Sequence, residues 1–364
     1  MTLLKSPLHD VHVELKASFG EFAGWQMPLT YTSGIKEHLA VRENAGIFDI
    51  SHMGRIIVKG DESLTFLQKL VPKDLSEVPP GYMSGPTAFL NENAGFKDDV
   101  MLYNMGNKWL IVCNAVNREK ILDWLNHWKT KWGANVEIKD ETFNIAMLAL
   151  QGPNSAKYME EIGLNAVLDL QMFQFKTNVE LKYGALFLIS RSGWTGEDGF
   201  EILGKPEVVG KIFKELVEKG VTPAGLAARD TLRLEMGFVL YGHDIDENIT
   251  PIEARYWVWT PGKKGYVGYE ALIKKLKKGV DRIRIGLKMK KKVKAIPREG
   301  DKIVIEGVEV GTITSGNYSP TLKRGIAMGY INSRHALIGL GVEVNIRGRF
   351  YPGKLSDFPL YRKG

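Results

Sequence analysis

The sequence has little of what disulfide frameworks, metal centres and membrane spans are built from. It contains a single cysteine, Cys113, so it can form neither an intrachain disulfide nor a cysteine metal cluster. Its seven histidines are scattered from His9 to His335 without the spacing of metal ligands. No run of about 18 apolar residues occurs, and the N-terminus lacks the apolar core of a signal peptide. These absences predict a cytoplasmic protein with no metal and no membrane partner.

Charge is abundant but unevenly spread. The chain carries 49 Lys and Arg against 42 Asp and Glu, a net charge of +7. The segment Lys274–Arg298 alone holds twelve basic residues and one acid, Asp281, a local net of +11. Such a segment either attracts an acidic partner or is an ordinary solvated face. It lacks aromatic residues that could stack on bases, so we expect no nucleic-acid partner.

The first 278 residues mix helices and strands without a regular repeat, which predicts an α+β fold. Apolar periodicity and turn residues predict helices at 35–44, 61–70, 117–132, 154–162, 208–219, 224–235 and 269–278, and strands at 47–58, 87–90, 99–103, 109–113, 146–151 and 185–190. In the first helix, Ile35, Leu39 and Val41 are expected to face inward. Asn117 is expected to cap the third helix.

After Gly279 the sequence pattern changes to that of short strands separated by turns with Gly and Asn. Residues 282–289 alternate strictly between polar and apolar side chains, and strands are also expected at 302–305, 308–314, 326–331 and 342–346. This pattern predicts a small all-β module, either a barrel or a sandwich.

Two adjacent acids, Asp98 and Asp99, stand where a turn feeds a strand. Side chains on a strand alternate between faces, so the two carboxylates must point in opposite directions. If Asp99 faces a pocket, Met101 and Tyr103 lie beside it on that face. One acid with an aromatic neighbour suits a flat, nitrogen-rich ligand. The alternative is a solvated turn in which both acids simply begin the strand.

Three other motifs allow both a functional and a plain structural interpretation. The glycine-rich stretch Ser192–Glu201 lacks the Lys-Ser/Thr ending of a phosphate loop. It could present Trp194 on a turn that lies close to a ligand, or be a plain surface loop. The Asp49–His52 stretch has the letters of a hydrolase triad, but residues this close along a strand rarely face one another. In helix 224–235, Arg229 could bind a carboxylate ligand or form a local ion pair.

Several strings, taken in their order along the chain, resemble the aminomethyltransferase (T protein) family of the glycine cleavage system. They are Phe22–Trp25, Met27–Leu29, Phe48–Gly54, the Asp98-Asp99 hairpin, Gln151–Pro153, Trp194–Glu201, Gly225–Glu235, Leu240–Asn248 and Thr314–Leu322. The resemblance runs from about residue 7 to the C-terminus. It implies an α+β three-domain clover-leaf whose last domain, residues 279–364, is a small β-barrel. Residues 1–278 would form two interleaved α+β domains, about 1–50 with 140–250 and about 51–139 with 251–278.

The resemblance also implies a reaction. The enzyme would transfer the methylene of the aminomethyl group on the lipoyl arm of H protein to tetrahydrofolate. The products would be 5,10-methylenetetrahydrofolate, ammonia and dihydrolipoyl H protein. The P and L proteins of the same system are further candidate partners. The basic segment Lys274–Arg298 could steer an acidic H protein or a folate glutamate tail.

Matching the family's motifs residue by residue implies a site. The family's essential acid corresponds to Asp99 of this chain. The implied folate-contacting residues are Met53, Tyr103, Val112, Asn114, Trp194, Glu201, Arg229 and Arg362. On this basis Glu201 and Asn114 would hydrogen-bond the pterin edge, while Arg229 and Arg362 would neutralise the glutamate end of the folate.

The chain departs from the family pattern at four positions where relatives usually carry tyrosine: Pro86, Met172, Trp194 and Phe238. The acceptor is therefore either tetrahydrofolate or a modified reduced pterin. A folate-dependent demethylase or methyltransferase of the same fold, acting on an amine or sulfonium donor, is the alternative function. An iron–sulfur-assembly protein of this fold is disfavoured, because its Lys-Gly-Cys-Tyr signature is replaced by a cysteine-free stretch at Lys263–Glu270.

Overall fold

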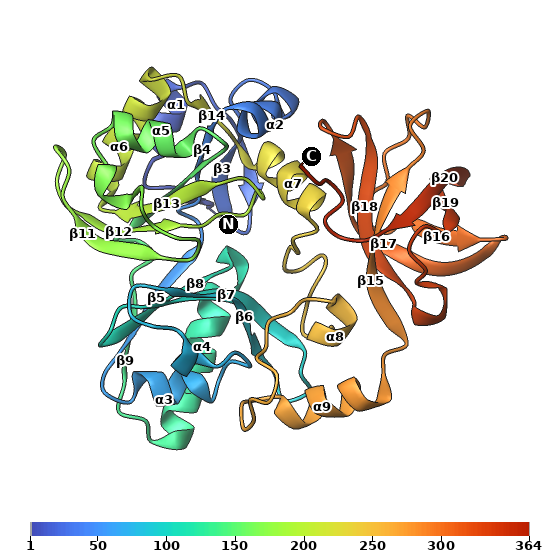
Figure 1. The fold of residues 1–364 in the computed structure, drawn as a ribbon, viewed down its shortest axis with the longest axis horizontal. Helices are drawn as coiled ribbons and strands as arrows, with labels where there is room; N and C mark the ends of the chain where they lie inside the picture. Colours follow the sequence, from blue (N-terminus) through green and yellow to red (C-terminus); the bar gives the residue numbers. More distant parts are fainter. Residues whose placement is uncertain (1, 364) are drawn as a thin grey trace. The chain divides into compact units, whose positions relative to one another are not determined.

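The computed structural model describes residues 2–363, which divide into two compact units. Unit 1 contains the residues up to Phe89, Lys97–Arg229 and Trp259–Tyr266, and unit 2 contains Leu90–Phe96, Asp230–Val258 and the residues from Val267 onward. Helices and strands are mixed and the C-terminal strands close a barrel, which confirms the α+β prediction (Figure 1). Within residues 2–363, no helix is long and apolar enough to cross a membrane.

One sheet of unit 1 has six strands in the order β11-β12-β13-β10-β4-β14. Its elements are β4 (Gly46–Asp49), β10 (Ala146–Gln151), α5 (Ser155–Glu161), η3 (Asn165–Val167), β11 (Phe175–Val179), β12 (Leu186–Arg191), β13 (Gly199–Gly204), α6 (Pro206–Glu218) and β14 (Thr222–Pro223). Every residue of β10 is buried, as its unbroken apolar run predicts. Leu148 and Ile202 pack with Met159 of α5 and Phe213 of α6 in one apolar cluster. This cluster is the apolar core between the six-stranded sheet and its helices.

A five-stranded sheet follows the order β6-β7-β8-β5-β9. Its elements are β5 (Gly54–Lys59), α3 (Ser63–Gln68), η1 (Leu75–Glu77), β6 (Met83–Leu90), β7 (Phe96–Asn104), β8 (Lys108–Cys113), η2 (Ala115–Asn117), α4 (Arg118–Trp132) and β9 (Glu137–Asp140). The three predicted sequential strands are confirmed as β6, β7 and β8. The predicted cap is wrong in detail. Asn117 does precede α4, but its side chain makes no capping bond and donates to Asp98 instead, at 2.6 Å.

The N-terminal part of unit 1 forms a small three-stranded sheet, ordered β1-β3-β2. Its elements are β1 (Leu4–Lys5), α1 (His9–Glu14), β2 (Ser18–Phe22), β3 (Trp25–Thr30) and α2 (Gly34–Glu43). Val41 of α2 is buried as predicted, but Ile35 is 51% exposed. The helix is turned to bury Glu37, whose carboxylate accepts three backbone N–H bonds, two from the preceding turn and one from Gly225. Those bonds offset the cost of burying a charge.

Unit 2 contains a closed barrel in the order β15-β18-β17-β16-β19-β20. The elements of the unit are α8 (Pro251–Ala254), α9 (Tyr269–Lys278), β15 (Arg282–Met289), β16 (Lys302–Ile305), β17 (Val308–Ser319), β18 (Arg324–Asn332), η4 (Ser333–His335), β19 (Gly341–Ile346) and β20 (Arg349–Ser356). Of the two predicted architectures, the barrel is the one formed. Strand β20 was not predicted, because Pro352 and Gly353 within it are typical of turns.

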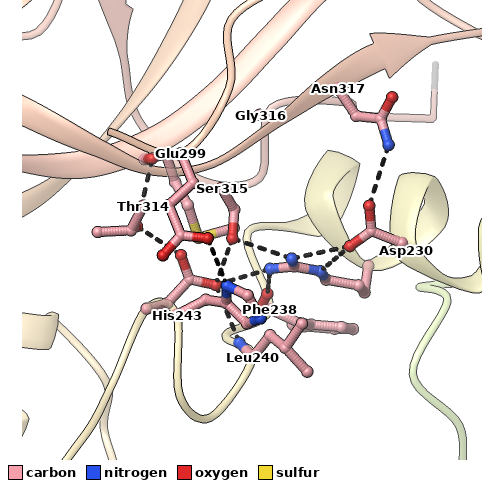
Figure 2. A network of polar contacts seen from close by, with 12 residues as sticks. Asp230, Phe238, Leu240, His243, Glu299, Thr314, Ser315, Gly316 and Asn317 are labelled. Atoms are coloured by element: carbon pink, nitrogen blue, oxygen red, sulfur yellow. Dashed lines mark hydrogen bonds and ion pairs between the residues drawn. The ribbon is translucent and has the colours of Figure 1, made fainter. Parts of the chain in front are cut away.

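A buried polar network joins the chain after helix α7 (Leu226–Met236) to the barrel strand β17 (Figure 2). Asp244 accepts hydrogen bonds from Arg233 at 2.7 Å, from the Leu240 backbone at 2.9 Å and from Ser315 at 3.0 Å. Arg233 also pairs with Asp230 at 2.8 Å. The local Arg–Asp pair considered for this helix is therefore formed by Arg233.

Candidate functional site

Strand β7 presents its two aspartates on opposite faces of the five-stranded sheet. Asp98 is fully buried, whereas Asp99 is partly exposed. Met101 pairs with Val112 across the ladder to β8. Since directly opposed residues share a face, Asp99 and Tyr103, which flank Met101, lie on the same face as Val112. The predicted grouping on this face is confirmed.

Asn114, just beyond the end of β8, holds both acids. Its side-chain amide donates to Asp98 Oδ1 at 2.7 Å and to Asp99 Oδ1 at 2.8 Å, and its backbone N–H donates to Asp98 Oδ2 at 2.9 Å. Burial and the adjacent Asp99 charge raise the pKa of Asp98 well above its ordinary range. Hydrogen bonds from Asn114 and Asn117 lower it, but by less. One amide thus fixes the orientation of the Asp99 carboxylate.

Glu201 lies on strand β13 and is 8% exposed. Its Oε2 accepts hydrogen bonds from the Tyr103 hydroxyl at 3.2 Å and from Ser192 Oγ at 2.6 Å. Burial and the Glu201 charge raise the pKa of Tyr103 well above its ordinary value, so that the phenol stays a donor. These contacts link the Asp99 face of β7 to the six-stranded sheet within unit 1.

Arg229 and His52 each carry a buried nitrogen without a partner. Among the described residues, neither Arg229 Nη1 nor His52 Nδ1 has a hydrogen-bond partner. Burial lowers the pKa of Arg229, and the nearby Glu201 opposes this shift. Burial and the Arg229 charge lower the pKa of His52 to about 3, so its imidazole is neutral near pH 7. Unsatisfied buried polar atoms are costly, so these two nitrogens are candidates for contact with a polar ligand.

Met53 lies in the tight turn between β4 and β5. Arg55 is fully buried, and its guanidinium donates to the carbonyls of Ser51, at 2.9 Å, and of Met53 and Thr142. Burial lowers the pKa of Arg55 to about 10, still well above neutral pH. Three carbonyls thus replace a carboxylate partner for this charge, and they fix the turn that carries Met53.

The Trp194 loop is held by contacts with buried side chains and is not a plain surface loop. A Cβ at Gly193 or at Gly199 would overlap the Gln151 side chain, which explains both glycines without a ligand. Thr195 Oγ1 donates to Gln151 at 2.8 Å. Arg42 donates to the Thr195 carbonyl at 2.7 Å and pairs with Glu197 at 3.0 Å. The loop therefore holds Trp194 on a rigid base.

The structure brings eight of the nine predicted site residues into unit 1, and Arg362 belongs to unit 2. The charge of Arg362 acts there on Lys288 and Asp357, and its contact with folate stays a prediction. Sequence reasoning missed the positions of Asn117, Ser192 and His52. Their roles depend on residues elsewhere in the chain: Asn117 donates to Asp98 and Ser192 to Glu201, while the Arg229 charge, 177 residues away, acts on His52.

The Asp49–His52 stretch does not form a hydrolase triad. Instead, Asp49 forms a buried pair with His12, outside the stretch. His12 Nε2 lies 2.7 Å from Asp49 Oδ2. Burial alone would raise the pKa of Asp49, but hydrogen bonds from His12, Ser51 and Ser6 outweigh it and lower the pKa to about 2. A folded pKa below the unfolded value of about 3.9 stabilises the fold above pH 4, and that contribution is lost as the pH falls towards 2.

We therefore expect the unfolding free energy to fall by about 2 kcal/mol more between pH 5 and pH 2 in the wild type than in Asp49→Asn. Urea denaturation at a series of pH values measures this difference. Asp10→Asn, which changes an exposed acid on α1, is the control. Equal pH slopes in the wild type and Asp49→Asn would contradict the assignment.

Two family models match the chain. Residues 8–261 match the GCVT N-terminal domain, and residues 282–362 match the glycine cleavage T-protein C-terminal barrel domain. The first match alone covers more than half of the sequence.

Whole-chain relatives agree with these matches. A probable aminomethyltransferase of Aeropyrum pernix is 46% identical and covers 100% of this chain and 99% of its own. An aminomethyltransferase of Halothermothrix orenii is 41% identical, covering 98% and 99%. The crystal structure of glycine cleavage system aminomethyltransferase T from Bartonella henselae superposes with a TM-score of 0.91 at 34% identity, covering 99% and 98%.

Proposed function

Because the chain belongs to the glycine cleavage T-protein family and is an aminomethyltransferase, we propose that the Asp99 face of unit 1 is where its one-carbon acceptor binds and reacts. The observation that best supports this proposal is that Asn114 orients the Asp99 carboxylate, on a face of the sheet that Tyr103 and Val112 share. The alternative demethylase function is not favoured, since relatives that match over nearly the whole chain are aminomethyltransferases.

The enzyme transfers the methylene of the aminomethyl group on the lipoyl arm of H protein to an acceptor, with release of ammonia. The family uses tetrahydrofolate as the acceptor, and we take tetrahydrofolate, or a modified reduced pterin, as the acceptor here. Asp99 lies beside the acceptor nitrogen in this proposal. Its carboxylate orients that nitrogen and stabilises the positive charge that develops as ammonia leaves, an effect typically worth a few kcal/mol. Proton transfer by the same group is the second possible role.

Glu201 accepts hydrogen bonds from the pterin edge in this proposal. Tyr103 and Ser192 already hold one of its oxygens, so the carboxylate is fixed before the ligand arrives. The family resemblance implies Arg229 at the glutamate end of the folate. Its burial and its interaction with Glu201 favour the pterin end instead, where its unpartnered Nη1 meets a carbonyl oxygen.

H protein is the proposed partner, since the T proteins of this family act on the lipoyl arm that it carries. The basic segment Lys274–Arg298 lies on α9, on β15 and on the chain that follows them in unit 2. Its steering of an acidic partner stays a proposal, testable by the salt dependence of the association rate.

The proposal is tested by product analysis. Purified protein with aminomethyl-loaded H protein and tetrahydrofolate should release ammonia and 5,10-methylenetetrahydrofolate, and small methyl donors should give no product. Glu201→Gln should raise the Kd of tetrahydrofolate about tenfold or more, because a charged acceptor of hydrogen bonds is lost.

Glu207→Gln, which changes an exposed acid at the start of α6, should leave the Kd unchanged. Mass spectrometry of pterins retained on the purified protein identifies the natural acceptor. Turnover of methyl donors without H protein, or an unchanged Kd in Glu201→Gln, would overturn the proposed site.

A further inference from the structure

Asp98 is a buried acid that the proposed reaction does not use directly. It is fully buried, and its side chain lies on the face of β7 opposite to that of Asp99. Its carboxylate accepts two hydrogen bonds from Asn114, at 2.7 and 2.9 Å, and one from the side-chain amide of Asn117, at 2.6 Å. A buried carboxylate needs such donors to offset the loss of water. Asp98 therefore depends on the turn that supplies them.

All three donors come from one short turn. Asn114 directly follows the last residue of β8, and the backbone N–H of Asn117 donates to the Asn114 carbonyl at 3.0 Å. The turn then continues through η2 into α4. Asn117 is only 2% exposed, so water does not compete for its amide. Both side-chain amides donate to the same oxygen, Asp98 Oδ1. The turn and the buried acid therefore hold each other in place.

Asn114 connects this network to Asp99. Met101 pairs with Val112 across the ladder, and the same register continued by two residues places Asn114 opposite Asp99. A side-chain amide has two N–H groups. Asn114 donates to Asp98 Oδ1 at 2.7 Å and to Asp99 Oδ1 at 2.8 Å. A flipped amide would turn its carbonyl oxygen towards both carboxylates, so Asp98 fixes which end of the Asn114 amide faces Asp99.

We propose that Asp98 and Asn117 are positioning residues for the transfer reaction, and that they act through Asn114 to hold the Asp99 carboxylate in its reactive orientation. The inference rests on the proposed function, in which Asp99 stabilises the charge that develops as ammonia leaves. Three consecutive hydrogen bonds of 2.6, 2.7 and 2.8 Å join Asn117 to Asp99. Neither Asp98 nor Asn117 is a catalytic residue, because Asp98 lies on the far face of β7 and Asn117 reaches the site only through it.

The test is a double-mutant cycle in the full-length enzyme with aminomethyl-loaded H protein and tetrahydrofolate. Asn117→Ala should lower the single-turnover rate constant about tenfold, because even a small misplacement of a reacting group slows the reaction. The Kd of tetrahydrofolate should change by less than about twofold, since ground-state binding does not use the Asp99 charge. In the Asp99→Asn background, Asn117→Ala should change the rate constant by less than about twofold, because the charge that it positions is absent.

Asp98→Asn is the second variant of the cycle. It keeps the shape of the side chain but turns an N–H group towards the amides that donate to Asp98, so it should also slow the reaction only where Asp99 is present. Asn126→Ala is the matched control. It removes an exposed asparagine of α4 whose amide donates to the Leu122 carbonyl at 2.9 Å, and it should leave the rate constant unchanged in both backgrounds.

Equal losses from Asn117→Ala with and without the Asp99 carboxylate would overturn the inference, because the substitution would then act on the fold as a whole. Rate constants at the wild-type level in both Asn117→Ala and Asp98→Asn would overturn it too. Either failure leaves the loss of turnover in Asp99→Asn intact. Wild-type turnover in Asp99→Asn would instead refute the proposed function.

Discussion

Replacing Asp99 with Asn is expected to lower kcat about 100-fold while changing the Kd of tetrahydrofolate by less than about threefold. The amide keeps the shape of the carboxylate, and its oxygen can still accept the 2.8 Å hydrogen bond from Asn114. The negative charge is lost. An interaction that matters only as positive charge develops should therefore appear in kcat and not in ground-state binding.

The measurement is single-turnover formation of 5,10-methylenetetrahydrofolate from aminomethyl-loaded H protein, with Kd determined separately by titration. Asp123→Asn removes an exposed acid from α4 and should behave as the wild type. Asp99→Glu tests placement, because it keeps the charge but moves it by one methylene. Turnover of Asp99→Asn within a few fold of the wild type would remove Asp99 from the mechanism.

Replacing Asp244 with Ala is expected to lower the unfolding free energy by about 3–5 kcal/mol, the usual cost of breaking a buried ion pair from one side. Asp244 is fully buried and accepts hydrogen bonds from Arg233, Ser315 and Thr314 as well as from the Leu240 backbone. Its removal leaves these buried donors without their acceptor. Arg233 keeps Asp230 as a partner, which limits the loss.

A contrasting pair in the same network supplies the control. His243 lies 2.7 Å from Glu299, but both side chains are about half exposed, and surface ion pairs contribute at most about 1 kcal/mol. Glu299→Gln should therefore change the unfolding free energy by less than about 1 kcal/mol. Urea denaturation of the full-length variants, followed by circular dichroism, compares the two. Equal losses would mean that the buried network adds nothing beyond a surface pair.

Local patterns predicted many of the regular elements, but the predicted strand 47–58 is wrong: it is two strands, β4 and β5, in different sheets. The alternation of residues 282–289 and the apolar run of residues 146–151 match β15 and β10 at their observed bounds. The strand period of two is also sufficient to place Asp99 and Tyr103 on one face. Predictions failed where glycine or proline lies inside a strand. Strand β13 begins at Gly199 within a stretch interpreted as a loop, and that glycine is required because Gln151 packs against it.

Contacts between distant segments could not be predicted. In helix 224–235 either arginine could have paired with a neighbouring acid. The structure pairs Arg233 and leaves Arg229 Nη1 without a partner in the part of the chain it describes. In α2, the apolar pattern placed Ile35 inward, but Ile35 is exposed and Glu37 is buried, where it accepts a hydrogen bond from Gly225, 188 residues away.

The sequence by itself determined the family, five of the six barrel strands and the face of β7 that carries Asp99. These follow from ordered motifs and from side-chain periodicity, which are properties of neighbouring residues. Only the tertiary structure decided which buried charges are paired and which amide orients Asp99. The physical reason is that a buried polar group takes its partner from whichever segment packs against it, and packing joins residues that are remote along the chain.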